Sequence, residues 1–159
     1  MQARMTNPVF LVPEAMQALQ AFAGAGRGGG LTARLIELVN LRASQINGCS
    51  VCVQMHAAAL KQGGETDERL YAVAAWRETP YFTPAERAAL ALAEAGTRLA
   101  DRPDAVSDEG WDEAARHYDE AGLAALVRAR AGINVWNRLN AMTRQVAGQW
   151  KPASVARTA

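Results

Sequence analysis

The chain contains two cysteines, Cys49 and Cys52, and they form a C-x-x-C pair. Two thiols at this spacing can cycle between a dithiol and a disulfide, or can supply two ligands to a zinc ion. A disulfide between them would close too small a loop to add much stability by restricting the unfolded chain. Redox or metal chemistry therefore explains the pair better than a structural role does.

Zinc binding and a thioredoxin fold are both disfavoured by the surroundings of the pair. A structural zinc site needs four ligands, and a catalytic site needs three ligands and a water. The sequence has no second C-x-x-C pair, and its two histidines, His56 and His117, lack the usual paired spacing. A thioredoxin fold needs strands around the motif, whereas the patterns on both sides are helical. The residues favour a redox dithiol on a helical scaffold, without a metal ion or an organic cofactor.

Two further residues are candidates for acid–base work on the thiols. Cys49 and Cys52 fall at the expected start of a helix, where unpaired backbone N–H groups and the helix dipole lower a thiol pKa. His56 follows Cys52 by four residues, so it lies on the same helix face and can accept the thiol proton. Glu37 lies among apolar residues of the preceding helix, and antiparallel packing of the two helices would bring it to His56. An exposed glutamate and a structural histidine are the alternatives.

Apolar residues recur at helical spacing along most of the chain, and no segment shows the alternation of a half-buried strand. The clearest start signal is Thr83-Pro84-Ala85-Glu86, which combines a capping box with proline at the first helical position. We expect an all-α fold of six or seven helices. The expected helices cover residues 7–23, Thr32 to Asn47, Cys49 to Gly63, Thr66 or Asp67 through Trp76, Thr83 to about Leu99, Ser107 through Tyr118, and Gly122 to Val146, with a glycine-rich loop at residues 24–30.

The length and charge of the chain limit its function classes. A chain of 159 residues is expected to form one domain over residues 1–159. With 17 Lys and Arg against 16 Asp and Glu, the net charge of +1 gives no field to recruit nucleic acid or anionic lipid. No apolar run approaches the roughly 18 residues that cross a bilayer. We therefore expect a cytoplasmic protein that binds neither nucleic acid nor membrane.

The spacing Glu37-x11-Cys49-x2-Cys52-x3-His56, within ELVNLRASQINGCSVCVQMHAAALKQGG, resembles the core motif of a known family. It is similar to the motif of AhpD-like alkylhydroperoxidases in the carboxymuconolactone decarboxylase superfamily. The resemblance extends to FTPAERAALALAEAGTRL and AGINVWNRLNAM. It covers a core of about residues 31–142.

This resemblance implies an all-helical protein that assembles as a homo-oligomer, a trimer or a hexamer. Such proteins reduce a hydroperoxide substrate, or recycle a peroxiredoxin, with electrons from a thiol reductant or a protein disulfide partner. The resemblance assigns peroxide attack to Cys52, and proton donation and resolution of the sulfenic acid to Cys49. It assigns the proton relay to Glu37 and His56.

One position departs from the resemblance, and two other functions stay open. The better-known enzyme has a second histidine between its cysteines, where this chain has Val51. A non-enzymatic redox-sensing or interaction module would use the same pair without turnover. The carboxymuconolactone decarboxylase branch acts on a lactone ring without a C-x-x-C pair, so Cys49 and Cys52 argue against it.

Overall fold

The computed structural model describes residues 1–25 and 30–149, so most of the glycine-rich loop expected at residues 24–30 lies outside the description. Eight α-helices and one 3₁₀ helix make up the regular structure of these residues, with no strand among them, and the expected all-α fold is confirmed. None of these helices is long and apolar enough to cross a bilayer. The helices are α1 (Pro8–Leu11), α2 (Pro13–Gly24), α3 (Ala33–Ile46), α4 (Ser50–Gln62), α5 (Asp67–Ala72), η1 (Val73–Glu78), α6 (Pro84–Thr97), α7 (Asp108–Ala115) and α8 (Glu120–Met142).

Two expected helices are broken. Val12 has non-helical backbone angles (φ −130°, ψ 89°) and separates α1 from α2, because Pro13 disfavours the helical conformation in the residue before it. The helix expected to run through Trp76 ends at Ala72 and continues as the 3₁₀ helix η1. This change of winding accompanies the burial of the Trp76 side chain.

The last helix is shifted from its expected limits. α8 begins at Glu120 rather than Gly122, because the Asp119 side chain accepts a hydrogen bond from the Gly122 amide and caps the helix. It ends at Met142 rather than Val146. The other starts agree with their cap signals, including the complete capping box between Thr83 and Glu86.

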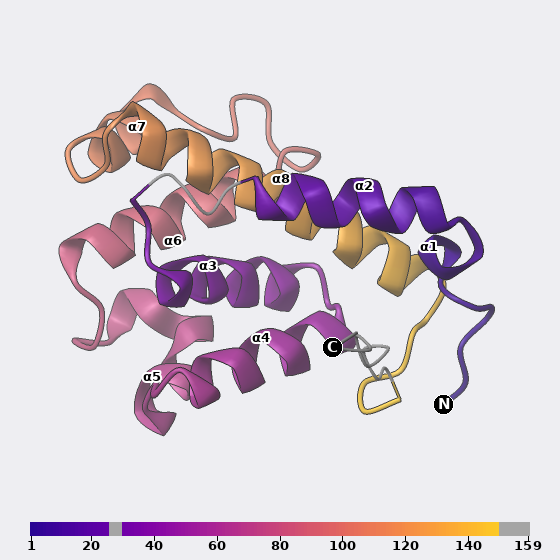
Figure 1. The fold of residues 1–159 in the computed structure, drawn as a ribbon. Coiled ribbons are helices and arrows are strands. Elements are labelled where there is room, and N and C mark those ends of the chain that lie inside the picture. Colours follow the sequence, from indigo (N-terminus) through magenta and orange to yellow (C-terminus); the bar gives the residue numbers. More distant parts are fainter. Residues whose placement is uncertain (26–29, 150–159) are drawn as a thin grey trace, which may run out of the picture.

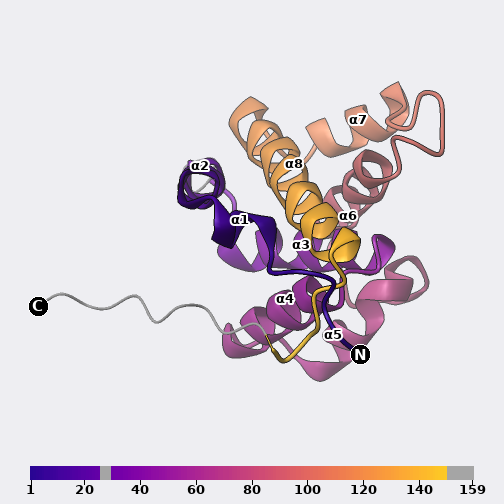
Figure 2. The same ribbon diagram turned by 90° about the vertical axis from the view of Figure 1, so that its right-hand side faces the viewer.

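α3 is the central helix of the fold. It contacts α4, α6 and α8, and it lies between α8 and α4 (Figure 1). The core residues of α3, Leu38, Val39 and Leu41, are almost completely buried. α2 lies on the outer side of α8, away from α6 and α7 (Figure 2). Because α3 holds α4 and α8 together, it sets the position of the cysteine pair.

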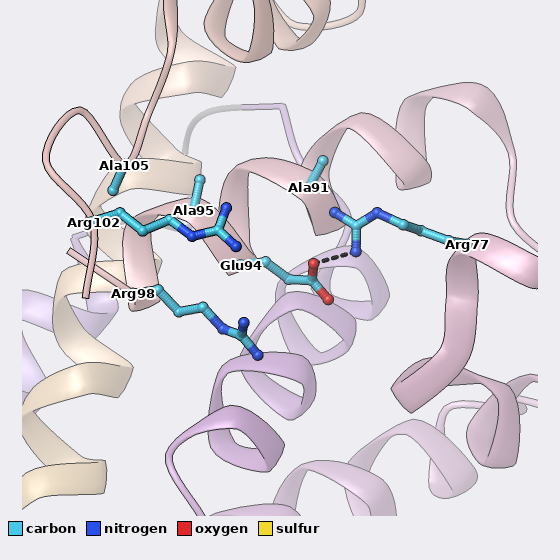
Figure 3. A pocket seen from close by; sticks show the side chains of 7 residues that line it. All are labelled: Arg77, Ala91, Glu94, Ala95, Arg98, Arg102 and Ala105. Carbon is cyan, nitrogen blue, oxygen red and sulfur yellow. Dashed lines mark hydrogen bonds and ion pairs between the residues drawn. The ribbon is translucent and has the colours of Figure 1, made fainter. Parts of the chain in front are cut away.

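Glu94 joins three elements around this core. Its carboxylate accepts hydrogen bonds from Arg42 of α3 at 2.6 Å and from the Trp76 indole at 3.1 Å, and it pairs with Arg77 of η1. It lines a pocket of about 380 Å³, where Arg98 and Arg102 approach from the side opposite Arg77 (Figure 3). Burial opposes ionisation, but the hydrogen bonds of Arg77, Arg42 and Trp76 keep the pKa of Glu94 below its ordinary value.

Candidate active site

The turn between α3 and α4 presents Cys49 at a helix start. Gly48 has a positive φ of 65°, a conformation that glycine adopts without steric cost. The Cys49 amide donates to the Ser44 carbonyl at 3.0 Å, which closes the Schellman motif that ends α3. Cys49 is then the N-cap of α4, and its Sγ atom accepts a hydrogen bond from the Cys52 amide at 3.4 Å. The tight turn thus fixes one thiol against free backbone N–H groups.

The two thiols lie together in the buried core. Their Sγ atoms are 2.7 Å apart, and both cysteines are free and at most 3% exposed. Val51 packs in the same cluster, with Ile133 and Trp136 of α8. A disulfide bond is about 2.0 Å long, so only a small movement separates the dithiol from the disulfide.

Hydrogen bonding gives the two thiols opposite pKa shifts. The hydrogen bond from the Cys52 thiol is the largest cause that lowers the pKa of Cys49 to about 6. Burial opposes this shift, whereas the Cys52 backbone N–H and the Asn140 and Asn137 side chains support it. The same thiol–thiol hydrogen bond and burial raise the pKa of Cys52. The resting pair therefore carries its negative charge on Cys49 and its proton on Cys52.

Glu37 and His56 form a hydrogen-bonded pair between α3 and α4. The Oε2 atom of Glu37 lies 2.6 Å from the Nδ1 atom of His56, which is the approach expected from antiparallel packing. A carboxylate only accepts hydrogen bonds, so Nδ1 carries a proton and Nε2 of a neutral His56 is the free base. His56 is one turn beyond Cys52 on α4. The pair therefore supplies an oriented acid–base group on the helix of the thiols.

Three buried asparagines of α8, Asn134, Asn137 and Asn140, line the α8 side of the site. Asn140 Nδ2 donates to Cys52 Sγ at 3.3 Å, and Asn140 Oδ1 accepts from Asn7 at 2.7 Å. Asn137 Nδ2 donates to Ser44 at 3.1 Å, and its Oδ1 accepts from Asn47 at 2.9 Å. Asn140 therefore contacts the Cys52 thiol directly, and Asn137 binds Ser44 and Asn47 next to the turn that presents Cys49.

The asparagines were not predicted from the sequence. Asn134, Asn137 and Asn140 recur every three residues in the stretch AGINVWNRLNAM, whose other residues are apolar apart from Arg138. A polar stripe on a buried helix face is a signal for an internal hydrogen-bond network. Asn7 carries no such signal, because it lies in a short N-terminal segment outside the expected core of residues 31–142. Its contact with Asn140 brings this segment to the site.

Metal ligands do not gather around the thiols in the described part of the chain. No group of three or more His, Cys, Asp or Glu residues there could hold a metal ion. His117 lies just after α7 and bonds with Glu113 at 3.3 Å. It therefore takes no part in the arrangement around Cys49 and Cys52.

Glu37, Cys49, Cys52 and His56 lie within a segment that known proteins share. Residues 13–95, over half of the chain, match the model of the carboxymuconolactone decarboxylase family. This chain belongs to the carboxymuconolactone decarboxylase family. YdfG from Bacillus subtilis, an uncharacterized relative, is 34% identical over 130 residues, which are 82% of this chain and 87% of YdfG.

Solved structures place the chain among the AhpD-like members of the superfamily. A protein of unknown function from Agrobacterium tumefaciens, provisionally named antioxidant defence protein AhpD, is 32% identical with a TM-score of 0.85, and the match covers 92% of this chain and 98% of that one. The debrominase Bmp8 has a TM-score of 0.73 at 22% identity, covering 86% of this chain and 73% of its own, and shares the fold. The expected resemblance to AhpD-like proteins is thereby confirmed.

Proposed function

We propose that this carboxymuconolactone decarboxylase family member is a thiol-dependent peroxidase or disulfide oxidoreductase. Its catalytic residues would be Cys49, Cys52, His56 and Glu37. The observation that carries the proposal is the buried dithiol, with Sγ atoms 2.7 Å apart and opposite pKa shifts, on the same helix as an oriented histidine. Neither a metal ion nor an organic cofactor is required.

The reaction begins with proton transfer inside the pair. The Cys52 thiol passes its proton to the Cys49 thiolate, and the Cys52 thiolate attacks the terminal oxygen of a hydroperoxide. The S–O bond forms as the O–O bond breaks, and the departing alkoxide takes the proton back from Cys49. The products are an alcohol and a sulfenic acid on Cys52. The low pKa of Cys49 leaves it as a thiolate again for the next step.

The second step forms the disulfide. The Cys49 thiolate attacks the sulfur of the Cys52 sulfenic acid, the S–S bond forms, and hydroxide leaves. Hydroxide takes a proton from the protonated ring of His56 and becomes water, while Glu37 stabilises the charged ring. His56 receives this proton in the reductive step, which releases one proton when the pair is restored with Cys49 as a thiolate. A thiol reductant or a protein disulfide partner then reduces the disulfide by exchange and restores the dithiol. We propose that the protein is cytoplasmic, a compartment that supplies such reductants.

The test is steady consumption of cumene hydroperoxide with dithiothreitol as electron donor. Wild-type protein is expected to turn over many times, and Cys52→Ser is expected to be inactive. The exposed Met142→Ala variant, which lies outside the cysteine pair and its proton relay, serves as the matched control with full activity. Absence of turnover with intact, reduced thiols would exclude the peroxidase.

A redox sensor without turnover is the second candidate, and the chain of contacts from Cys52 through Asn140 to Asn7 favours it. Formation of the disulfide would move the Cys52 sulfur and alter its hydrogen bond with Asn140, and Asn140 would pass this change to Asn7 of the N-terminal segment. Peroxide would then change the rate at which a protease cleaves that segment, and one equivalent of peroxide per chain would complete the change. Catalytic consumption of peroxide distinguishes the enzyme from the sensor.

We further propose that the protein is a homo-oligomer, a trimer or a hexamer. α2 has no buried residue, and Phe10, Leu11 and Phe22 of the α1–α2 segment are more than 40% exposed. Exposed apolar faces of this kind mark interfaces. Light scattering at micromolar concentration is expected to show an oligomer, and a stable monomer would contradict the proposal.

A further inference from the structure

A second pocket, the α6–α8 pocket, lies between α6, α7 and α8 and has a volume of about 420 Å³. Its walls are largely apolar, with Leu92, Trp111 and Leu126 among the lining residues. Its polar lining includes Arg130 and Arg138, two residues on the same face of α8. The size suits a small ligand, and a few polar groups in an apolar pocket are typical of a binding site.

Arg130 is a buried cation in this pocket without a carboxylate partner. It is 6% exposed, and its aliphatic stem passes over Gly96, where an added Cβ would lie 3.3 Å from its Cγ atom. Its Nη2 atom donates to the Val39 carbonyl at 2.9 Å. The Nε and Nη1 atoms are buried and have no hydrogen-bond partner among residues 1–25 and 30–149.

A buried guanidinium with unpaired donors is unfavourable, because the charge has lost its hydration without gaining an anion. Burial lowers the pKa of Arg130 to about 10, which leaves the side chain charged at neutral pH. Arg138 adds a second cation, and no carboxylate is among the residues that line the pocket. The ligand that best fits this pocket is therefore an anion whose uncharged part is apolar.

We propose that the α6–α8 pocket binds a small amphipathic monocarboxylic acid, with its carboxylate on Arg130 and its apolar body against Leu126 and Trp111. The end of a guanidinium presents two parallel N–H donors to a carboxylate, so a carboxylate on Arg130 would accept from Nη1, which has no partner, and from the second N–H of Nη2, whose first donates to Val39. This ligand site shares Asn134 with the α8 side of the dithiol site, but it contains neither cysteine and does not rest on the peroxidase proposal.

Calorimetric titration of the full-length protein tests the site with octanoate and octanamide, which have the same chain and differ in charge. Octanoate is expected to bind at least about tenfold more tightly than octanamide, because its hydrogen bonds to Arg130 are charge-assisted. Arg130→Met is expected to remove this preference. Arg116→Met, at an exposed arginine outside the pocket, is expected to keep it.

Thermal unfolding supplies a readout that does not need a tight ligand. Octanoate is expected to raise the melting temperature of the wild type and not that of Arg130→Met, while Arg130→Lys keeps part of the shift. Equal binding of octanoate and octanamide, or no binding of either, would overturn the proposal. If the wild type does not bind octanoate and Arg130→Met dissociates the oligomer, the ligand proposal is overturned. The anion beside Arg130 would then belong to a second copy of the chain.

Discussion

The Nδ2 atom of Asn140 lies 3.3 Å from the Sγ atom of Cys52, which joins the last turn of α8 to the first turn of α4. The opposite side of the same amide accepts a hydrogen bond from Asn7 at 2.7 Å, so the NH₂ group faces the sulfur. A donor in this position stabilises a thiolate, and contacts with Asn140 lower the pKa of both cysteines. Asn140 thus favours the thiolate form of the cysteine pair.

We expect Asn140→Ala to raise the pKa of Cys49. Asn140 is one of the smaller causes that lower this pKa, and one lost hydrogen bond is worth roughly 0.5–1.5 kcal/mol, so alkylation of Cys49 by iodoacetamide near pH 6 should slow by about two- to sevenfold. The measurement is the alkylation rate against pH, with the labelled cysteine identified by mass spectrometry. An unchanged midpoint in Asn140→Ala would show that the amide has only a packing role.

The low pKa of Cys49 predicts a distinct pH dependence. Its alkylation rate in the wild type should rise as the pH passes through about 6, below the ordinary thiol pKa of about 8.5. Because the Cys52 thiol is the largest cause of this shift, Cys52→Ala should move the midpoint upward toward the ordinary value. If Cys52→Ala keeps the wild-type midpoint, the start of α4 lowers the pKa without the second thiol.

The Glu37–His56 pair is expected to act on turnover more than on stability. General acid–base catalysis typically contributes about 10²–10⁴-fold to a rate, so Glu37→Gln and His56→Ala should each lower kcat by a factor in this range. The double variant should have the same kcat as His56→Ala, because Glu37 contributes only by orienting and stabilising the His56 ring. The exposed Glu78→Gln variant is a charge-matched control with unchanged kcat.

The helices were predictable because their signals are local. Thr83 and Glu86 lie three residues apart and satisfy each other's backbone amides, so the sequence alone marks this helix start. The approach of Glu37 to His56 was also expected, since a short turn between two amphipathic helices leaves antiparallel packing as the natural arrangement. The distance of 2.6 Å agrees with that expectation.

Contacts between distant segments were not predictable in the same way. Asn7 and Asn140 are 133 positions apart, and Asn140 and Cys52 are 88 positions apart, so no local pattern records their proximity. Arg130 is buried without a carboxylate partner because of how α8 packs against α3 and α6. The spacing of apolar residues along α8 predicts a helix but not this packing. The direction of the thiol pKa shifts likewise required the position of each sulfur.

Glu94 predicts the pH dependence of stability. Its pKa is lowered in the folded protein, so its ion pairs stabilise the fold fully above the ordinary glutamate pKa, and the contribution is lost as the pH falls through the lowered value. Glu94→Gln should cost about 2 kcal/mol near neutral pH, less than a fully buried pair because solvent screens the exposed Arg77. Urea unfolding measures the difference, which should shrink near pH 3. The half-buried Glu113→Gln variant, whose ion pairs with Arg116 and His117 are short-range contacts within and just after α7, should show little change at either pH.

The roles of the two cysteines can be separated by trapping. In the proposed reaction, the sulfenic acid forms on Cys52 and is consumed by the neighbouring Cys49 thiolate. Cys49→Ser should therefore react once with peroxide and accumulate a dimedone adduct on Cys52. Cys52→Ser should give no adduct on Cys49, since the proposed reaction assigns attack on the peroxide to Cys52 alone. The two variants share the same scaffold, and mass spectrometry of each locates the adduct. An adduct on Cys49 in Cys52→Ser, with none on Cys52 in Cys49→Ser, would reverse the roles and make the low-pKa thiolate the attacking group.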